Sequence, residues 1–197
     1  MKHIMVDLET METRADAAVV SIGAVEFDPE TGDLGREFYQ VVDLDSSLKA
    51  GLTISGGSIY WWLMQSEAAR KALTECNVPL DDALIGLEIF WRQTGAEFIW
   101  GHGPSFDVAI LQTAYLNIFG KHPWKYNAAR DTRTIYDDAD AWPSPEKQKH
   151  VNGLPHNALE DAKAQAHFVI DASKKLAEMK AAWSAAQLYG PLVTSPG

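Results

Sequence analysis

An apolar, strand-like segment that ends in two acids is the feature that most constrains the fold of this chain. His3-Ile4-Met5-Val6 is too apolar for an exposed edge strand, and it runs directly into Asp7-Leu8-Glu9. Residues i and i+2 of a strand point to the same face, so Asp7 and Glu9 project side by side. Such a pair is compatible with a solvated strand end. On a buried central strand, two adjacent carboxylates are costly unless a cation neutralises them.

The order of the other segments predicts an α/β fold. Apolar runs at 18–27 and 37–42 flank the turn-forming sequence 28–33, which makes the first three strands an antiparallel meander. The remaining segments are predicted helices over 58–73 and 80–91, a strand at 97–100, a helix capped by Ser105, a weak strand at 130–136, a loop at 137–155 and a helix from about 157 to 188. This order is typical of a three-layer α/β sandwich, with a central mixed sheet flanked by helices.

Composition limits the class of protein. The chain has 197 residues, of which 46% are hydrophobic, and this predicts one folded domain over 1–189 with a flexible C-terminal tail at 190–197. No apolar run approaches the ~20 residues of a membrane span and no signal peptide is evident, so we expect a cytoplasmic protein that makes no membrane contact. Cys76 is the only cysteine, which excludes a disulfide within the chain and a multi-cysteine zinc site. The net charge of −10 argues against wrapping a long duplex but allows nucleic acid at a metal site.

Further acids and one histidine lie where strands end and helices begin. Asp107 falls in the first turn of a predicted helix, and His156 precedes Asp161 by five residues, with a helix beginning between them. Each has an ordinary alternative, since acids stabilise helix N-termini and a histidine can lie in a surface loop. Together they supply carboxylates for Mg²⁺ or Mn²⁺ and an imidazole that removes a proton near neutral pH. Hydrolysis of a phosphodiester is the reaction that this set suits.

Three motifs resemble those of the DEDDh 3′→5′ exonucleases of the ribonuclease H-like superfamily, in the same order. They are Met5-Val6-Asp7-Leu8-Glu9-Thr10, then Gly103-Pro104-Ser105-Phe106-Asp107 with Leu111, and His156-Asn157-Ala158-Leu159-Glu160-Asp161-Ala162. The segments 59–66, 124–126 and 130–134 resemble the small branch typified by a mycobacterial exoribonuclease and shared with phage exonucleases. One departure is Gly103, where many members of the superfamily have Asn.

The resemblance implies a ribonuclease H-like fold and two divalent metal ions, Mg²⁺ or Mn²⁺. It implies that Asp7 bridges the two ions, that Glu9 and Asp161 complete the shell of the first, and that Asp107 holds the second. His156 is then the general base that takes a proton from the attacking water. The products are nucleoside 5′-monophosphates, released from the 3′ ends of single strands or overhangs.

The sequence also offers candidate substrate contacts. Aromatic side chains stack on bases of any identity, although burial in the core is their ordinary alternative. The candidates are Thr10, Met11, Trp61, Trp62, Phe106 and His102. Arg14, Arg130, Arg133 and Lys163 are candidates for phosphate contacts, against ordinary surface ion pairs. The loop 138–154, which contains Lys147-Gln148-Lys149-His150, is a candidate lid with the weakest order of the chain.

Several alternatives remain open. The leading hypothesis is a metal-dependent 3′→5′ exonuclease with RNA favoured over DNA, and the first alternative is a DNA-directed enzyme of phage or recombination type. The others are a non-catalytic nucleic-acid-binding domain of the same fold and an endonuclease of the ribonuclease H type. The sequence does not decide between Mg²⁺ and Mn²⁺, or whether duplex regions are degraded. It also leaves open whether the chain forms a homo-oligomer.

Overall fold

The computed structural model describes residues 1–144 and 156–189. The predicted tail at 190–197, and residues 145–154 of the predicted lid, lie outside this described part. None of the helices in the described part combines the length and the apolar character that a membrane span requires.

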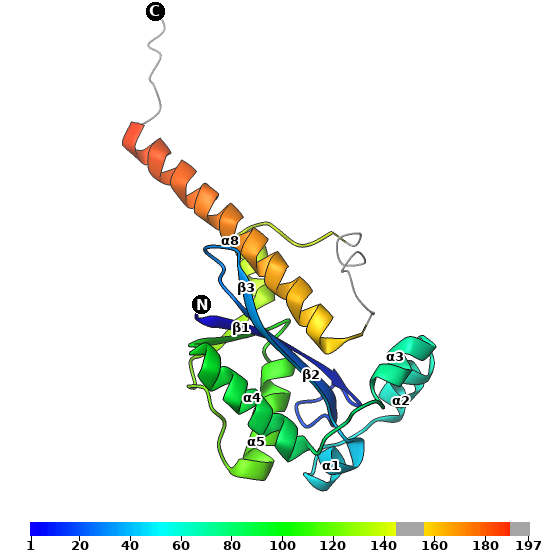
Figure 1. Cartoon of the computed structure of the whole chain (residues 1–197). Coiled ribbons are helices and arrows are strands. Elements are labelled where there is room, and N and C mark those ends of the chain that lie inside the picture. Colours follow the sequence, from blue (N-terminus) through cyan, green and yellow to red (C-terminus); the bar gives the residue numbers. More distant parts are fainter. Residues whose placement is uncertain (145–155, 190–197) are drawn as a thin grey trace, which may run out of the picture.

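A five-stranded mixed sheet forms the centre of the molecule (Figure 1). Its order is β3-β2-β1-β4-β5, so the acid-bearing strand β1 is central, as the sequence predicts. β1 pairs antiparallel with β2 and parallel with β4, while β2 and β3 complete the predicted meander. The strands are β1 (His3–Thr10), β2 (Val19–Phe27), β3 (Leu34–Val41), β4 (Phe98–Gly101) and β5 (Ala129–Asp131).

Helices cover both faces of the sheet and make the three predicted layers. Side chains of α4 and α5 pack with Ile4, Val6 and Leu8 on one face, whereas α6 and α8 pack around Met5 on the other (Figure 1). Because side chains alternate along β1, Asp7 and Glu9 share the face of Met5 and of α8. The helices are α1 (Leu44–Lys49), α2 (Gly56–Leu63), α3 (Glu67–Ala72), α4 (Leu80–Thr94), α5 (Asp107–Phe119), α6 (Thr132–Asp138) and α8 (Ala158–Tyr189).

Some sequence-predicted elements are wrong in detail, and local capping explains two of them. The single helix expected over 58–73 is divided into α2 and α3, because the hydroxyl of Ser66 accepts a hydrogen bond from the backbone of Ala69 and starts a new helix. The strand expected over 130–136 stops at Asp131, whose carboxylate accepts from the backbone N–H of Arg133 and caps α6. The short helix α1 was not predicted.

The start of α5 also differs from the prediction. Phe106 occupies the cap position and no side chain caps the helix, so Ser105 does not have the predicted role. Asp107 is nevertheless the first helical residue, as expected.

Candidate active site

Asp7 and Glu9 project side by side from the central strand toward α8. Asp7 is partly buried, and its Oδ1 accepts a hydrogen bond of 2.7 Å from Nε2 of Gln165 on α8. Glu9 is only 8% exposed. The strand therefore fixes both carboxylates, and α8 supplies a donor that orients the first.

Asp107 reaches the same region from the start of α5, after the loop that follows β4. It is 3% exposed, and a Cβ atom on Gly101 would lie 3.0 Å from Oδ2 of Asp107. A glycine at position 101 thus leaves room for this carboxylate. The connection between them turns at Gly103, whose φ of +92° is a conformation that favours glycine.

A close approach between β2 and α8 brings the third motif to the site. A Cβ atom on Gly23 would lie 2.1 Å from the carbonyl carbon of Ala158, so only glycine allows the first residue of α8 to lie against the sheet. The side chain of Asn157 caps this helix by accepting from the backbone N–H groups of Leu159 and Glu160. Asp161 follows within the first turn.

His156 stands immediately before the cap of α8, with a positive φ of 63°. Its ring makes an edge contact with Trp61, with ring centroids 4.8 Å apart. Atoms of Glu9, His156 and Asp161 that can bind a metal lie within 4.8 Å of one another. Residues from β1 and from the start of α8 therefore converge.

Mutual repulsion and burial raise the proton affinity of the acids. Burial, followed by the charges of Asp161 and Asp107, raises the pKa of Glu9 to about 8. Burial also raises the pKa of Asp107 to about 7, although backbone hydrogen bonds and the charge of Arg133 oppose this. The pKa of Asp7 is raised well above its usual range by burial and by the charges of Asp107, Glu9 and Asp161. Asp7 thus lies within electrostatic reach of the other three carboxylates.

The donor set fits hard divalent cations. Four carboxylates supply only oxygen ligands, which Mg²⁺ and Mn²⁺ prefer. Burial raises the pKa of Asp161 as well, while the neighbouring His156 lowers it. A cluster whose members oppose one another's ionisation is stabilised by added positive charge.

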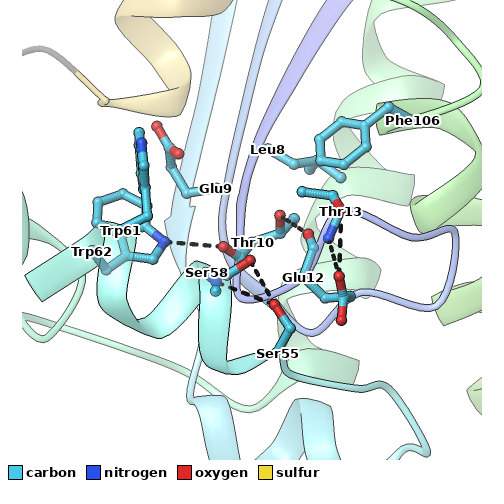
Figure 2. Close-up of a pocket in the computed structure, with 11 residues that line it drawn as sticks. Leu8, Glu9, Thr10, Glu12, Thr13, Ser55, Ser58, Trp61, Trp62 and Phe106 are labelled. Carbon is cyan, nitrogen blue, oxygen red and sulfur yellow. Dashed lines mark hydrogen bonds between the residues drawn. The ribbon is translucent and has the colours of Figure 1, made fainter.

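A cavity of about 470 Å³ opens beside Glu9 (Figure 2). Trp61 and Trp62 stand on one side of it, and Leu8 and Phe106 on the other. Its remaining lining is polar or small: Thr10, Glu12, Thr13, Ser55, Gly57 and Ser58. This volume lies in the range of small-ligand sites, and its opposed apolar walls suit a flat ring.

The candidate substrate contacts occupy different positions. Trp61 is 45% exposed, whereas Trp62 is 5% exposed and donates from Nε1 to the carbonyl of Thr10 at 3.0 Å. Met11 lies outside the lining of this cavity and packs partly buried against the core. His102 lines a second hollow of about 260 Å³ together with Asp7 and Asp161.

Several residues of the site were not singled out from the sequence. Gln165 contacts Asp7 although the two are 158 positions apart in the sequence, and no spacing rule connects them. In the sequence, Gly23 is an ordinary strand residue, and only the structure shows that α8 lies against it. Ser55 and Ser58 line the larger cavity because Ser55 caps α2, and a serine before a helical pattern is a signal that sequence analysis can use.

Comparison with known proteins supports the motif-based interpretation. Residues 2–172 match the family model described as a 3′-5′ exoribonuclease Rv2179c-like domain. An exodeoxyribonuclease of Enterobacteria phage T4 is 27% identical over 164 residues, which cover 68% of this chain and 70% of the phage protein.

Solved structures share the fold at low sequence identity. The nuclease domain of 3′hExo, a DEDDh family member bound to rAMP, has a TM-score of 0.56 and 12% identity, with 87% of this chain and 91% of that one covered. Exonuclease X in complex with 5′ overhanging duplex DNA has a TM-score of 0.52 and 17% identity, with coverage of 90% and 98%. The predicted ribonuclease H-like fold is thereby confirmed.

Proposed function

Because the chain belongs to the Rv2179c-like family of 3′-5′ exoribonucleases, among the DEDDh exonucleases, we propose that it hydrolyses the terminal phosphodiester of RNA with a two-metal site and a histidine base. A 3′-5′ exonuclease activity, dependence on divalent metal and binding of nucleic acid follow from the family. The choice of RNA, the number of ions and the role of each residue are the proposal.

The convergence of Asp7, Glu9, Asp107 and Asp161 carries this proposal. They come from β1, the start of α5 and the start of α8, and the charges of the other three raise the pKa of Asp7. A structural role gives no reason to gather four acids on one face of a sheet, because repulsion among them costs stability. A site for divalent cations gives such a reason.

Each residue then has a defined task. Asp7, Glu9 and Asp161 would hold one cation, and Asp7 with Asp107 would hold the second. When bound, such ions lower the pKa of water and stabilise the charge that develops on a phosphoryl group. His156 takes the proton of the attacking water, a task that an ionised carboxylate occupied by a cation cannot perform.

The larger cavity is the proposed site of the 3′-terminal nucleotide. Trp61, Phe106 and Leu8 offer faces to its base, while Thr10 lies at the end of β1 beside Glu9. A single strand fits this arrangement better than a duplex, because the base must enter between two walls. The product of each cycle is a nucleoside 5′-monophosphate.

DNA is the second candidate substrate, because a phage exodeoxyribonuclease is a relative of this chain. The 2′-hydroxyl distinguishes RNA from DNA at a given site. Digestion of matched RNA and DNA oligonucleotides separates the two candidates: we expect faster release of monophosphates from RNA, and a faster reaction on DNA favours the alternative.

We further propose that residues 1–189 act as one exonuclease domain. The two cores on either face of the sheet share β1 and β2, so neither layer forms a separate unit.

Substitutions of the acids and of the base test the mechanism. Asp7→Asn and Asp161→Asn should abolish the Mg²⁺- or Mn²⁺-dependent shortening of a 5′-labelled strand, and His156→Ala should slow it by about 10²–10⁴. Glu178→Gln, on an exposed turn of α8, is the matched control and should retain full activity. Activity that survives in either aspartate variant contradicts the proposed site. Internal fragments from a strand with a blocked 3′ end would favour an endonuclease.

A further inference from the structure

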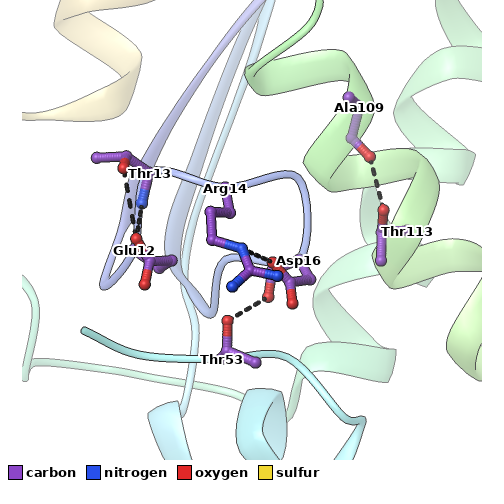
Figure 3. Close-up of polar contacts among 7 residues, drawn as sticks. All are labelled: Glu12, Thr13, Arg14, Asp16, Thr53, Ala109 and Thr113. Carbon is purple, nitrogen blue, oxygen red and sulfur yellow. Dashed lines mark hydrogen bonds and ion pairs between the residues drawn. The ribbon is translucent and has the colours of Figure 1, made fainter.

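Four basic side chains are candidates for phosphate contacts from the sequence. Two of them form ion pairs with neighbouring acidic side chains. Nε of Arg14 lies 3.3 Å from Oδ1 of Asp16, in the connection between β1 and β2 (Figure 3). Nζ of Lys163 lies 3.1 Å from Glu160 and 3.3 Å from Glu37. Their charges are therefore already compensated within the protein.

Arg130 also has hydrogen-bond partners, whereas the guanidinium of Arg133 has none among the described residues. Nη1 of Arg130 donates to the carbonyls of Asn127 and Ala129, both at 2.8 Å, and its guanidinium lies over the ring of Phe98. The guanidinium of Arg133 makes no ion pair or hydrogen bond with any described residue, and its side chain is exposed. All six arginines of the chain lie in the described part, and only this one has a guanidinium without such a partner there.

The guanidinium of Arg133 rests on the loop that leads to Asp107. A Cβ atom on Gly103 would lie 3.1 Å from Nη1 and 3.2 Å from Cζ of Arg133. The arginine thus occupies the space that a side chain at position 103 would need. The positive φ of Gly103 and this close contact both favour glycine at position 103.

Sheet topology places Arg133 at the edge that carries the acids. β1, β4 and β5 are parallel neighbours, and Gly101 of β4 pairs with Asp131 of β5, two residues before Arg133. The carboxyl ends of these strands meet at one edge, where Asp7 and Asp107 also lie. The charge of Arg133, on α6, acts on residues at both ends of the loop 102–107: after burial, it lowers the pKa of His102, and it opposes the rise in the pKa of Asp107.

This placement suits an external anion. A planar guanidinium donates two parallel hydrogen bonds to a phosphate, and beside an acidic cluster in a chain of net charge −10 it offers local attraction to a polyanion. An arginine whose purpose was to neutralise the acids would be expected to pair with one of them, and none of the described carboxylates lies within 4.0 Å of it.

We propose that the guanidinium of Arg133 binds a backbone phosphate of the strand whose terminus lies at the four carboxylates. The proposal rests on the proposed function, because it assumes a nucleic-acid strand at that site. Arg133 then contributes to binding the substrate, and Gly103 is the residue that lets its guanidinium lie there.

The salt dependence of binding tests this role. In the His156→Ala background, which keeps all four carboxylates, the affinity for a fluorescent single-stranded oligonucleotide is measured with Mg²⁺ between low and moderate salt. Loss of one phosphate contact lowers the magnitude of the slope of log K against log salt by about 0.7. We expect that change for Arg133→Met, a slope close to the original for Arg133→Lys, and no change for the control Arg14→Met.

Steady-state rates in the otherwise unaltered protein complete the test. Arg133→Met should raise KM by about tenfold with a small change in kcat, because one charge-assisted contact is lost. An unchanged slope and KM overturn the proposal. A fall in kcat and in Tm with an unchanged slope overturns it as well. That result would show that Arg133 has a structural role, through its packing against Gly103.

Failure of the proposed function gives a different result. If the unaltered protein binds the oligonucleotide but does not shorten it, the nuclease assignment is wrong. The slope of log K against log salt still tests whether Arg133 contacts a phosphate. If the unaltered protein binds no strand at all, both proposals are wrong.

Discussion

At the scale of single residues, Gln165 orients one carboxylate of the proposed metal site. Its Nε2 donates to Oδ1 of Asp7, and its own Oε1 is buried without a hydrogen-bond partner among the described residues. The donated hydrogen bond lowers the pKa of Asp7, against the larger effect of burial. One oxygen of Asp7 is thereby fixed, which leaves the other oriented toward the site.

We predict that Gln165→Leu weakens metal binding while it preserves the fold. Leucine fills a similar volume but donates no hydrogen bond, and loss of a partner that orients a metal ligand typically costs about 10–100-fold in affinity. Titration of the protein with Mn²⁺ by calorimetry, without substrate, measures this directly. Gln187→Leu, on the exposed part of α8, is the control. Equal Mn²⁺ affinity in the two variants would show that Asp7 needs no such support.

Residues differ in how far sequence alone predicts them. Asp7, Glu9, Asp107, His156 and Asp161 were proposed from three motifs, and the structure brings them to one region. Gln165 was missed, because its role exists only through a contact between the two ends of the domain. Local patterns carry no information about such a pair.

At the scale of elements, the contact between Gly23 and the start of α8 determines whether the site is assembled. β2 and α8 approach so closely that no side chain fits at position 23. The same helix supplies His156 just before its cap and Asp161 in its first turn. Displacement of α8 therefore moves both groups relative to β1.

We predict that Gly23→Ala lowers both stability and activity. Overpacking of this kind typically costs about 1–3 kcal/mol, and here the obstructing atoms are backbone, which cannot move as a side chain does. Thermal unfolding and release of monophosphates provide the two measurements. Gly56→Ala is the control, since a Cβ atom at that position meets nothing within 4 Å. A variant at position 23 with full activity and unchanged Tm would contradict this account of α8.

The elements themselves were only partly predictable. The strands β1 and β2 and the helices α4 and α8 have strong periodic patterns, and the structure confirms them. Two of the errors fall at Ser66 and Asp131, where one side-chain hydrogen bond to the backbone ends one element and begins another. Hydrophobic periodicity does not register such caps, because they depend on a single polar residue.

At the scale of the whole molecule, the acidic cluster links the stability of the fold to pH. Glu9 and Asp107 have pKa values of about 8 and about 7 in the folded chain, well above their ordinary values of 4.5 and 3.8. At a pH between the ordinary and the raised pKa values, the folded state therefore binds more protons than the unfolded state. Its stability falls as pH rises from about 4 to about 8.

We predict that the Tm of the metal-free protein decreases over this pH interval and that Mg²⁺ or Mn²⁺ restores it. The gain on adding metal should be larger at pH 8 than at pH 5.5, because ionised carboxylates bind cations and protonated ones do not. Scanning fluorimetry with EDTA or with metal measures both effects. Glu9→Gln should flatten the profile of the metal-free protein. A metal-induced gain that is equal at both pH values would show that these acids do not form the binding site.

The order of the site residues along the chain has a consequence for synthesis. Asp7, Glu9 and Asp107 leave the ribosome well before His156 and Asp161, which belong to the start of α8. On the proposed function, a nascent polypeptide shorter than this point lacks the proposed general base and one of the four proposed metal ligands, so we expect it to be inactive. The proposal therefore places the gain of hydrolytic activity late in synthesis, after the third motif has been translated.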